Sequence, residues 1–143
     1  MDPALLTWWG PISAVEAEIT LAFASESAIQ RIIERDGEPV GYAQAADASL
    51  WGGTLPPGLA TGQWDVDAFV ALPEIRDEGT TQALGLLCQE VFATTMAVGC
   101  CSFVSIKSEA SARAFERAGF RWERIWHDRH SGPSWVMELP RPR

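Results

Sequence analysis

The sequence predicts an α/β domain built on one mixed sheet. Apolar residues at Leu84, Leu87, Cys88 and Val91 have the spacing of a helix that packs on a sheet. Short runs with strand-like patterns lie on both sides of this segment. The expected order is helix, three strands, helix, strand, helix, two strands. This order combines hairpins with helical crossovers, so the sheet must contain both antiparallel and parallel pairs.

A helix and then a β-hairpin are expected first. Apolar residues recur at helical spacing within residues 13–23. Further on, Asp36 and Gly37 favour a tight turn, because both tolerate the positive φ that a two-residue hairpin requires. This turn joins strands that we expect at residues 28–34 and 39–46.

The third expected strand carries a polar face. Residues 63–72 alternate, so that Trp64 and Val66 lie on one face and Asp65 and Asp67 on the other. Two carboxylates on one face of a strand are candidates for acid–base chemistry or for binding a cation.

Periodicity and turn residues predict the remaining elements. Ser108 is a favourable helix N-cap, and Gly119 suits the left-handed position after a helix end. We expect helices at residues 80–97 and 108–118, and strands at 101–106, 120–127 and 134–139.

Size and charge limit the possible functions. The 143 residues, 47% hydrophobic and 21% charged, suit a single globular domain spanning 1–143. The net charge of -8 argues against nonspecific nucleic-acid binding. The uncharged run at residues 91–106 is too short and too polar for a membrane span.

The cysteines and the N-terminus indicate a cytoplasmic protein. Three cysteines, an odd number without metal-ligand spacing, suit a reducing compartment. The acidic start Met1-Asp2-Pro3 is unlike a secretion signal. His127 and His130 are too few to predict a metal site, so no metal is expected.

Several motifs resemble one superfamily. The segment at residues 114–120, A-F-E-R-A-G-F, resembles the Y-E-K-x-G-F motif of the GNAT acetyl-CoA-dependent acetyltransferases. Further stretches are similar to the aminoglycoside 6′-N-acetyltransferase branch: W-W-G at 8–10, G-E-P-V-G-Y-A-Q at 37–44, V-D-A-F at 66–69 and G-P-S-W-V-M at 132–137. The resemblance follows family order and implies a GNAT fold. Few residues precede W-W-G, so either the start of the chain is truncated or the sheet lacks the first strand of that fold.

The resemblance implies acetyl-CoA as co-substrate. In the family, backbone N–H groups at a strand-to-helix turn hold the pyrophosphate, and the matching stretch is 76–81. Thr81 stands where the family prefers Gly or Ala, and two acids, Asp77 and Glu78, would repel a pyrophosphate. The alternative is that these acids only complement the helix dipole. The coenzyme contacts implied are Val70, Ala71, Leu72, Arg76, Gly79, Thr80, Thr81 and Ser108.

The resemblance also implies the acceptor side. Asp67 aligns with an acid that binds or deprotonates the substrate amine, with Asp65 beside it. A solvated sheet face is the alternative for this pair. Phe115 stands where many members carry a proton-donating Tyr, and a phenyl ring cannot donate a proton. The substrate-binding residues expected are Trp8, Trp9, Trp51, Asp65 and Asp67, since aromatic walls suit a cationic acceptor.

The function implied is acetyl transfer from acetyl-CoA to a primary amine of a small, cationic molecule, aminoglycoside-like or another amine. Direct attack in a ternary complex is expected, because no cysteine aligns with a nucleophile position. A non-catalytic GNAT-like binding module remains the alternative, and a protein N-terminal acetyltransferase is a third. A missing first strand would leave the edge of residues 28–34 unpaired, so a homodimer is expected to cover it.

Overall fold

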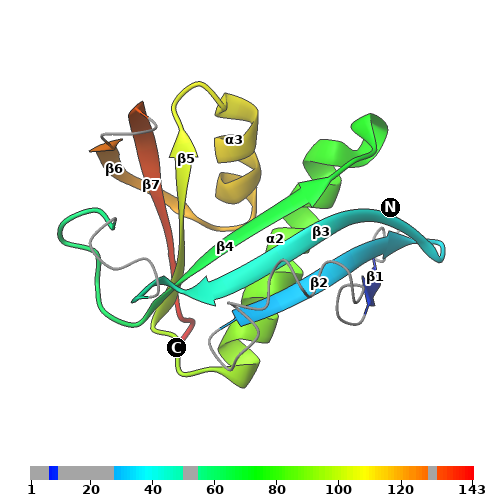
Figure 1. Ribbon diagram of the computed structural model, residues 1–143, viewed down its shortest axis with the longest axis horizontal. Helices are drawn as coiled ribbons and strands as arrows, with labels where there is room; N and C mark the ends of the chain where they lie inside the picture. Colours follow the sequence, from blue (N-terminus) through cyan, green and yellow to red (C-terminus); the bar gives the residue numbers. More distant parts are fainter. Residues whose placement is uncertain (1–6, 10–27, 50–54, 129–131) are drawn as a thin grey trace.

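One mixed sheet organises the molecule. The computed structural model describes residues 7–9, 28–49, 55–128 and 132–143. Its seven strands lie in the order β1-β2-β3-β4-β5-β7-β6 (Figure 1). The strands are β1 (Thr7–Trp9), β2 (Ala28–Arg35), β3 (Glu38–Asp47), β4 (Gln63–Val70), β5 (Gly99–Ser105), β6 (Arg121–Asp128) and β7 (Gly132–Pro140). A 3-10 turn, η3 (Pro73–Ile75), leads into α2 (Arg76–Thr94), and α3 (Glu109–Arg117) follows β5.

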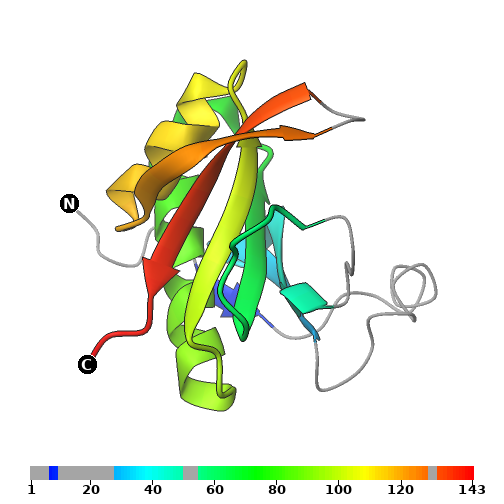
Figure 2. The same cartoon turned by 90° about the vertical axis from the view of Figure 1, so that its left-hand side faces the viewer.

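Two helices cover one face of this sheet. In Figure 2, α2 and α3 lie on the same side of the strands. The face of α2 that carries Leu84, Leu87 and Val91 is buried, and it packs against Val66 of β4 and Cys100 of β5 in one core cluster. Alternation along β4 then places Asp65 and Asp67 on the face away from the helices.

Turn chemistry agrees with the backbone at two positions. Asp36 and Gly37 have φ values of 52° and 81°, as the hairpin between β2 and β3 requires. Gly119 has a φ of 105° directly after α3, where it ends the helix. Both conformations were expected from the sequence.

β4 and β5 are parallel neighbours only at their beginnings. They pair at Gln63↔Gly99, Trp64↔Cys100 and Asp65↔Cys101, and no further pair joins them although both strands are described to their ends. β4 nevertheless stays paired with β3 up to Val70, and β5 with β7 up to Ser105. The sheet therefore opens between β4 and β5, as their diverging directions in Figure 1 show.

The fold class expected from the sequence is confirmed, with two corrections. The first strand is not missing, because β1 pairs with β2 at Thr7↔Glu34, Trp8↔Ile33 and Trp9↔Ile32. The residues of β1 are aromatic or β-branched and favour a strand. A segment of three residues is stable as a strand only when it pairs with another one, here β2. The expected helix at residues 13–23 lies outside the described residues.

The second correction concerns where the long helix begins. It starts at Arg76 rather than at residue 80, so the stretch 76–81 is helical and not a loop. Pro73 opens η3 just before it, and Asp77 and Glu78 fall in the first turn of α2, where negative charge is favourable. Among the described residues, no helix is long and apolar enough to cross a membrane.

Candidate active site

Asp67 lies at the centre of the face opposite the helices. Its partner across the β3–β4 ladder is Gln44, and the partner of Asp65 is Ala46. The side chain of Asp67 is exposed, and its Oδ1 accepts a hydrogen bond of 2.9 Å from the backbone N–H of Ala68.

The surroundings of Asp67 favour its protonated form. Although Asp67 is solvent-accessible on this face, the surrounding protein atoms displace part of the water around its carboxyl, and this desolvation raises the pKa above its usual value. The hydrogen bond from the Ala68 N–H opposes the rise. A carboxylate with a raised pKa is a better proton acceptor than an ordinary surface aspartate. Asp67 is therefore equipped to take a proton from an amine.

Two hollows adjoin Asp67. The larger, of about 150 Å³, spans the opening of the sheet and is lined by Gln44, Ala46, Asp65, Val66, Asp67, Ser102 and Phe103. The smaller, of about 60 Å³, is lined by Tyr42, Gln44, Asp67, Ala68 and Phe69. Gln44 and Asp67 line both hollows.

The sequence analysis did not assign the polar neighbours of Asp67. The Tyr42 hydroxyl donates a hydrogen bond of 2.7 Å to Gln44 Oε1, so the amide NH₂ of Gln44 is the group available toward the hollows. Alternation places Tyr42 and Gln44 on one face of β3, and the pairing of β3 with β4 brings them beside Asp67. The sequence alone did not give this strand register, and so Tyr42 and Gln44 were not assigned to the site.

The expected aromatic wall is described only in part. Trp8 and Trp9 lie on β1, and two strands, β2 and β3, separate β1 from β4. The side chains of Trp8 and Trp9 are outside the description. Trp51 also lies outside the described residues. Phe69 is 59% exposed beside the smaller hollow. An aromatic side chain does therefore adjoin Asp67, although the sequence did not single it out.

The beginning of α2 differs from the expected pyrophosphate loop. Arg76 donates from Nε to the Val70 carbonyl at 3.2 Å and from Nη2 to the Ala71 carbonyl at 3.4 Å. The Ala71 N–H donates to the Val40 carbonyl at 2.7 Å and is therefore already engaged. The Arg76 side chain thus stabilises the connection between β4 and α2 by hydrogen bonds to its backbone.

Within α2, the other implied coenzyme contacts, Gly79, Thr80 and Thr81, are consecutive residues that begin about one turn after the start of the helix. Gly79 is buried, and Thr80 follows it inside the helix. The Thr81 hydroxyl lies 3.0 Å from the Asp77 carbonyl and 3.3 Å from the Ala114 carbonyl, so it bridges toward α3. The N–H groups that helix geometry leaves at the N-terminus are those of Asp77 and Glu78, because the Arg76 N–H already donates to the Pro73 carbonyl.

Ser108 and Phe115 belong to α3. Ser108 is the N-cap residue and is exposed, and its side chain makes no capping hydrogen bond. Phe115 is 3% exposed and meets Phe120 edge to face, with ring centroids 5.0 Å apart. Phe115 is therefore a core residue, and it supplies no acid.

The opening of the sheet can receive an elongated ligand such as acetyl-CoA. Backbone groups along the parted edges of β4 and β5 have no partner strand there, and the N-termini of α2 and α3 offer N–H groups. Ser108, at the start of α3, is exposed for a contact. Asp77 and Glu78 weaken an anion site at α2 without blocking it, so the residues present fit this group.

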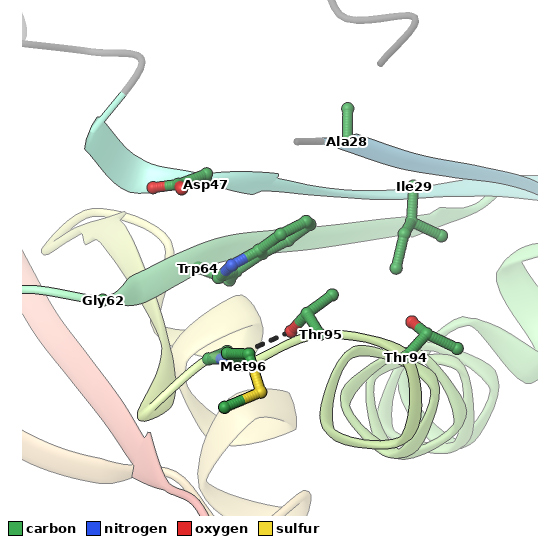
Figure 3. A pocket seen from close by; sticks show the side chains of 9 residues that line it. Ala28, Ile29, Asp47, Gly62, Trp64, Thr94, Thr95 and Met96 are labelled. Atoms are coloured by element: carbon green, nitrogen blue, oxygen red, sulfur yellow. Dashed lines mark hydrogen bonds between the residues drawn. The ribbon is translucent and has the colours of Figure 1, made fainter. Parts of the chain in front are cut away.

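A larger cavity lies elsewhere. It measures about 780 Å³ and is found where β4 begins and α2 ends, with Trp64, Asp47 and Met96 in its lining (Figure 3). Asp47 accepts a hydrogen bond from the Ser49 N–H, and Trp64 is 6% exposed. This cavity holds none of the residues around Asp67 and is not the candidate active site.

No metal centre is evident in the described part of the chain. None of its clusters combines three or more His, Cys, Asp or Glu side chains that could hold an ion. Cys88, Cys100 and Cys101 are free and buried.

Solved structures identify the fold. The aminoglycoside acetyltransferase AAC(6′)-Ib in complex with coenzyme A matches with a TM-score of 0.75 and 25% identity, over 94% of this chain and 80% of that chain. A chimera of the Vibrio cholerae spermidine N-acetyltransferase SpeG and hSSAT matches with a TM-score of 0.71 and 10% identity, over 96% of both chains. An aminoglycoside N(6′)-acetyltransferase from Legionella pneumophila matches with a TM-score of 0.67 and 12% identity, over 95% of this chain and 92% of that chain.

These matches confirm the resemblance drawn from the sequence. The chain has the fold of the GNAT acetyltransferases, and it is similar to their aminoglycoside 6′ type. No family model and no curated protein sequence matches the chain.

Proposed function

We propose that this protein transfers an acetyl group from acetyl-CoA to a primary amine of a small, cationic molecule, with Asp67 as the proton acceptor. The general class, an acetyl-CoA-dependent N-acetyltransferase, is that of its structural neighbours, one of which was solved with acetyl-CoA. The observation that carries the assignment is the position of Asp67 in a hollow where β4 and β5 part. The three free cysteines agree with a cytoplasmic protein.

Several described residues of the site have a role in this reaction. Asp65 and Asp67 attract the cationic acceptor, and Asp67 takes a proton from its nitrogen, which must be neutral to attack. Phe69 offers an apolar wall to the acceptor. The parted edges of β4 and β5 bind the arm of the coenzyme, whose thioester supplies the acetyl group. Ser108 and the N–H groups of Asp77 and Glu78 bind its polar parts.

Titration of the purified protein with acetyl-CoA tests the coenzyme half of this proposal. Calorimetry should give saturable binding, and the double substitution Asp77→Asn with Glu78→Gln should tighten it several-fold, because two negative charges near the pyrophosphate are removed. The matched control, Glu74→Gln in η3, removes one exposed acid just before the helix and should change binding less. Absence of binding by the unaltered protein would refute the proposal.

A panel of amines tests the acceptor half. Hydroxylated and unsubstituted di- and polyamines are offered with acetyl-CoA, and release of free CoA thiol is followed. Turnover with a cationic primary amine supports the enzyme. Binding of acetyl-CoA without turnover on any amine supports instead the non-catalytic binding module, which the buried Phe115 and the acids of α2 would suit.

A further inference from the structure

Asp65 lines the hollow of about 150 Å³ from a position between two small neighbours. Its partner across the β3–β4 ladder is Ala46, and its partner across the β4–β5 ladder is Cys101. Both neighbours are buried, and both have short side chains. The longer side chain of Gln44 belongs to the residue opposite Asp67 instead. Space beside the carboxylate of Asp65 is therefore continuous with the space beside Asp67.

Asp65 adds a second negative charge to this hollow. Cys101 is the last residue of β5 that pairs with β4, so Asp65 lies where the opening of the sheet begins. Burial and the negative charge of Asp65 raise the pKa of the Cys101 thiol, which therefore stays neutral. Asp65 also interacts within the protein. A carboxylate accepts several hydrogen bonds at once, so it can bind an ammonium group in addition.

The spacing of the two carboxylates sets the length of a ligand that reaches both. Residues i and i+2 of a strand lie about 7 Å apart on one face, and an extended chain of about four methylene groups between two nitrogens spans a similar distance. In the proposed reaction, Asp67 holds the nitrogen that loses its proton and attacks the thioester. A second nitrogen on such a chain reaches Asp65, where it stays protonated and donates a charge-assisted hydrogen bond.

The size of the hollow limits the shape of the ligand. Pockets that enclose drug-sized molecules measure roughly 300–1,000 Å³, whereas this hollow measures about 150 Å³. A short chain fits into this volume, and a set of linked rings does not. The space between Asp65 and Asp67 therefore suits a linear molecule.

We propose that the acceptor is a linear diamine with about four carbon atoms between its nitrogens, and that Asp65 selects it by binding the amine that does not react. This inference rests on the proposed acetyltransferase function. The nitrogen at Asp67 loses a proton and becomes the amide, and the coenzyme takes up a proton and leaves as the thiol. The ammonium group at Asp65 keeps its protons. Because the amide of the product carries no charge for Asp65 to bind, each diamine is acetylated once.

Matched amines test this selection. Turnover with acetyl-CoA is followed through the release of free CoA thiol, for linear diamines of increasing length and for monoamines of the same lengths. The diamine with about four carbons should have a kcat/KM about 10- to 100-fold above that of its monoamine, because the monoamine lacks the charge-assisted hydrogen bond. Mass spectrometry should find a single acetyl group on the product.

Asp65→Asn should remove this difference. The kcat/KM of the diamine should fall to about that of the monoamine, mainly through a higher KM, and the monoamine should be unaffected. Asp65→Glu, which keeps the charge, should retain a preference for diamines. Asp47→Asn, a matched change on β3 that lines the other cavity, should alter neither amine. Calorimetric titration with acetyl-CoA should show unchanged coenzyme binding, and therefore an intact fold, in all three variants.

The possible outcomes separate the two proposals. Equal kcat/KM values for the diamine and the monoamine in the unaltered protein would overturn the role of Asp65 and leave the acetyltransferase assignment intact. A preference for diamines that survives in Asp65→Asn would do the same, as would a higher kcat/KM for an aminoglycoside than for the diamine. Absence of turnover with every amine would overturn the proposed function, and the diamine assignment with it.

Discussion

Asp67 shows how far a single residue can be interpreted from sequence. Alternation along residues 63–72 predicted that Asp65 and Asp67 share a face, and the structure places both on the side opposite the helices. The raised pKa of Asp67 depends on the chain around it. Gln44 and Ser102 reach the same hollow from β3 and β5, and no local pattern in the sequence connects them with Asp67.

Asp67→Asn should lower kcat/KM about 100-fold or more, because an amide cannot accept the proton of the amine. In the unaltered enzyme, kcat/KM should fall as the pH drops through the pKa of Asp67, at a pH above the usual aspartate range. This acidic limb should be absent from the profile of the variant. Asp65→Asn is the matched control, and it should raise the KM of the amine with little change in kcat.

Asp67→Asn should also stabilise the folded protein at neutral pH. The raised pKa means that the folded state holds the Asp67 proton more tightly than the unfolded state, so ionisation opposes folding. Stability is therefore lost as the pH rises from the unfolded pKa to the folded one. Thermal melts should show Asp67→Asn as the more stable protein at pH 7, with the difference vanishing in acid. A variant that is less stable at pH 7 would contradict the cause given for the shift.

At the scale of elements, α2 is fixed at its end by a residue far away in the sequence. Arg141 donates to the carbonyls of Ala97 at 2.7 Å, Phe92 at 3.0 Å and Thr95 at 2.7 Å. Its guanidinium also lies 5.2 Å from the centre of the Phe92 ring. A cation that binds the last carbonyls of a helix opposes the negative end of the helix dipole. Arg141 thus compensates for the absence of basic residues in the last turn of α2.

Arg141→Ala should lower the free energy of unfolding by about 1–3 kcal/mol, because carbonyls at the end of α2 lose a charged donor. Chemical denaturation measures this loss. Arg141→Lys should recover only part of it, since an ammonium cannot reach three carbonyls in a planar fork. Arg143→Ala removes an exposed arginine two residues away and should be neutral; equal losses for both variants would indicate a general effect of charge.

At the scale of the whole molecule, the homodimer stays a prediction, but a shorter part of the β2 edge is left to form it. The edge of β2 was expected to be open along its length, but β1 pairs with Ile32, Ile33 and Glu34. The pairs described on this side of β2 leave Ala28–Arg31 for a second copy. Sedimentation equilibrium at tens of micromolar should give twice the monomer mass of 15.6 kDa.

Two substitutions of the same residue locate the interface. Gln30→Pro should produce a monomer if this edge pairs, because proline removes a backbone donor from the strand. Gln30→Ala, which keeps that donor, should remain dimeric. A monomeric unaltered protein would refute the prediction.

The sequence by itself determined the class of the fold, most of the strands and helices, both left-handed turn positions and the shared face of Asp65 and Asp67. These features follow from local periodicity and from the backbone preferences of single residues. Only the tertiary structure decided that β1 pairs with β2, that α2 begins at Arg76, and that Arg76 and Ala71 use their donors within the protein. It also decided where β4 and β5 part, and so which distant residues surround Asp67. Strand pairing and the packing of helices on the sheet are long-range interactions, and their partners are far apart along the chain.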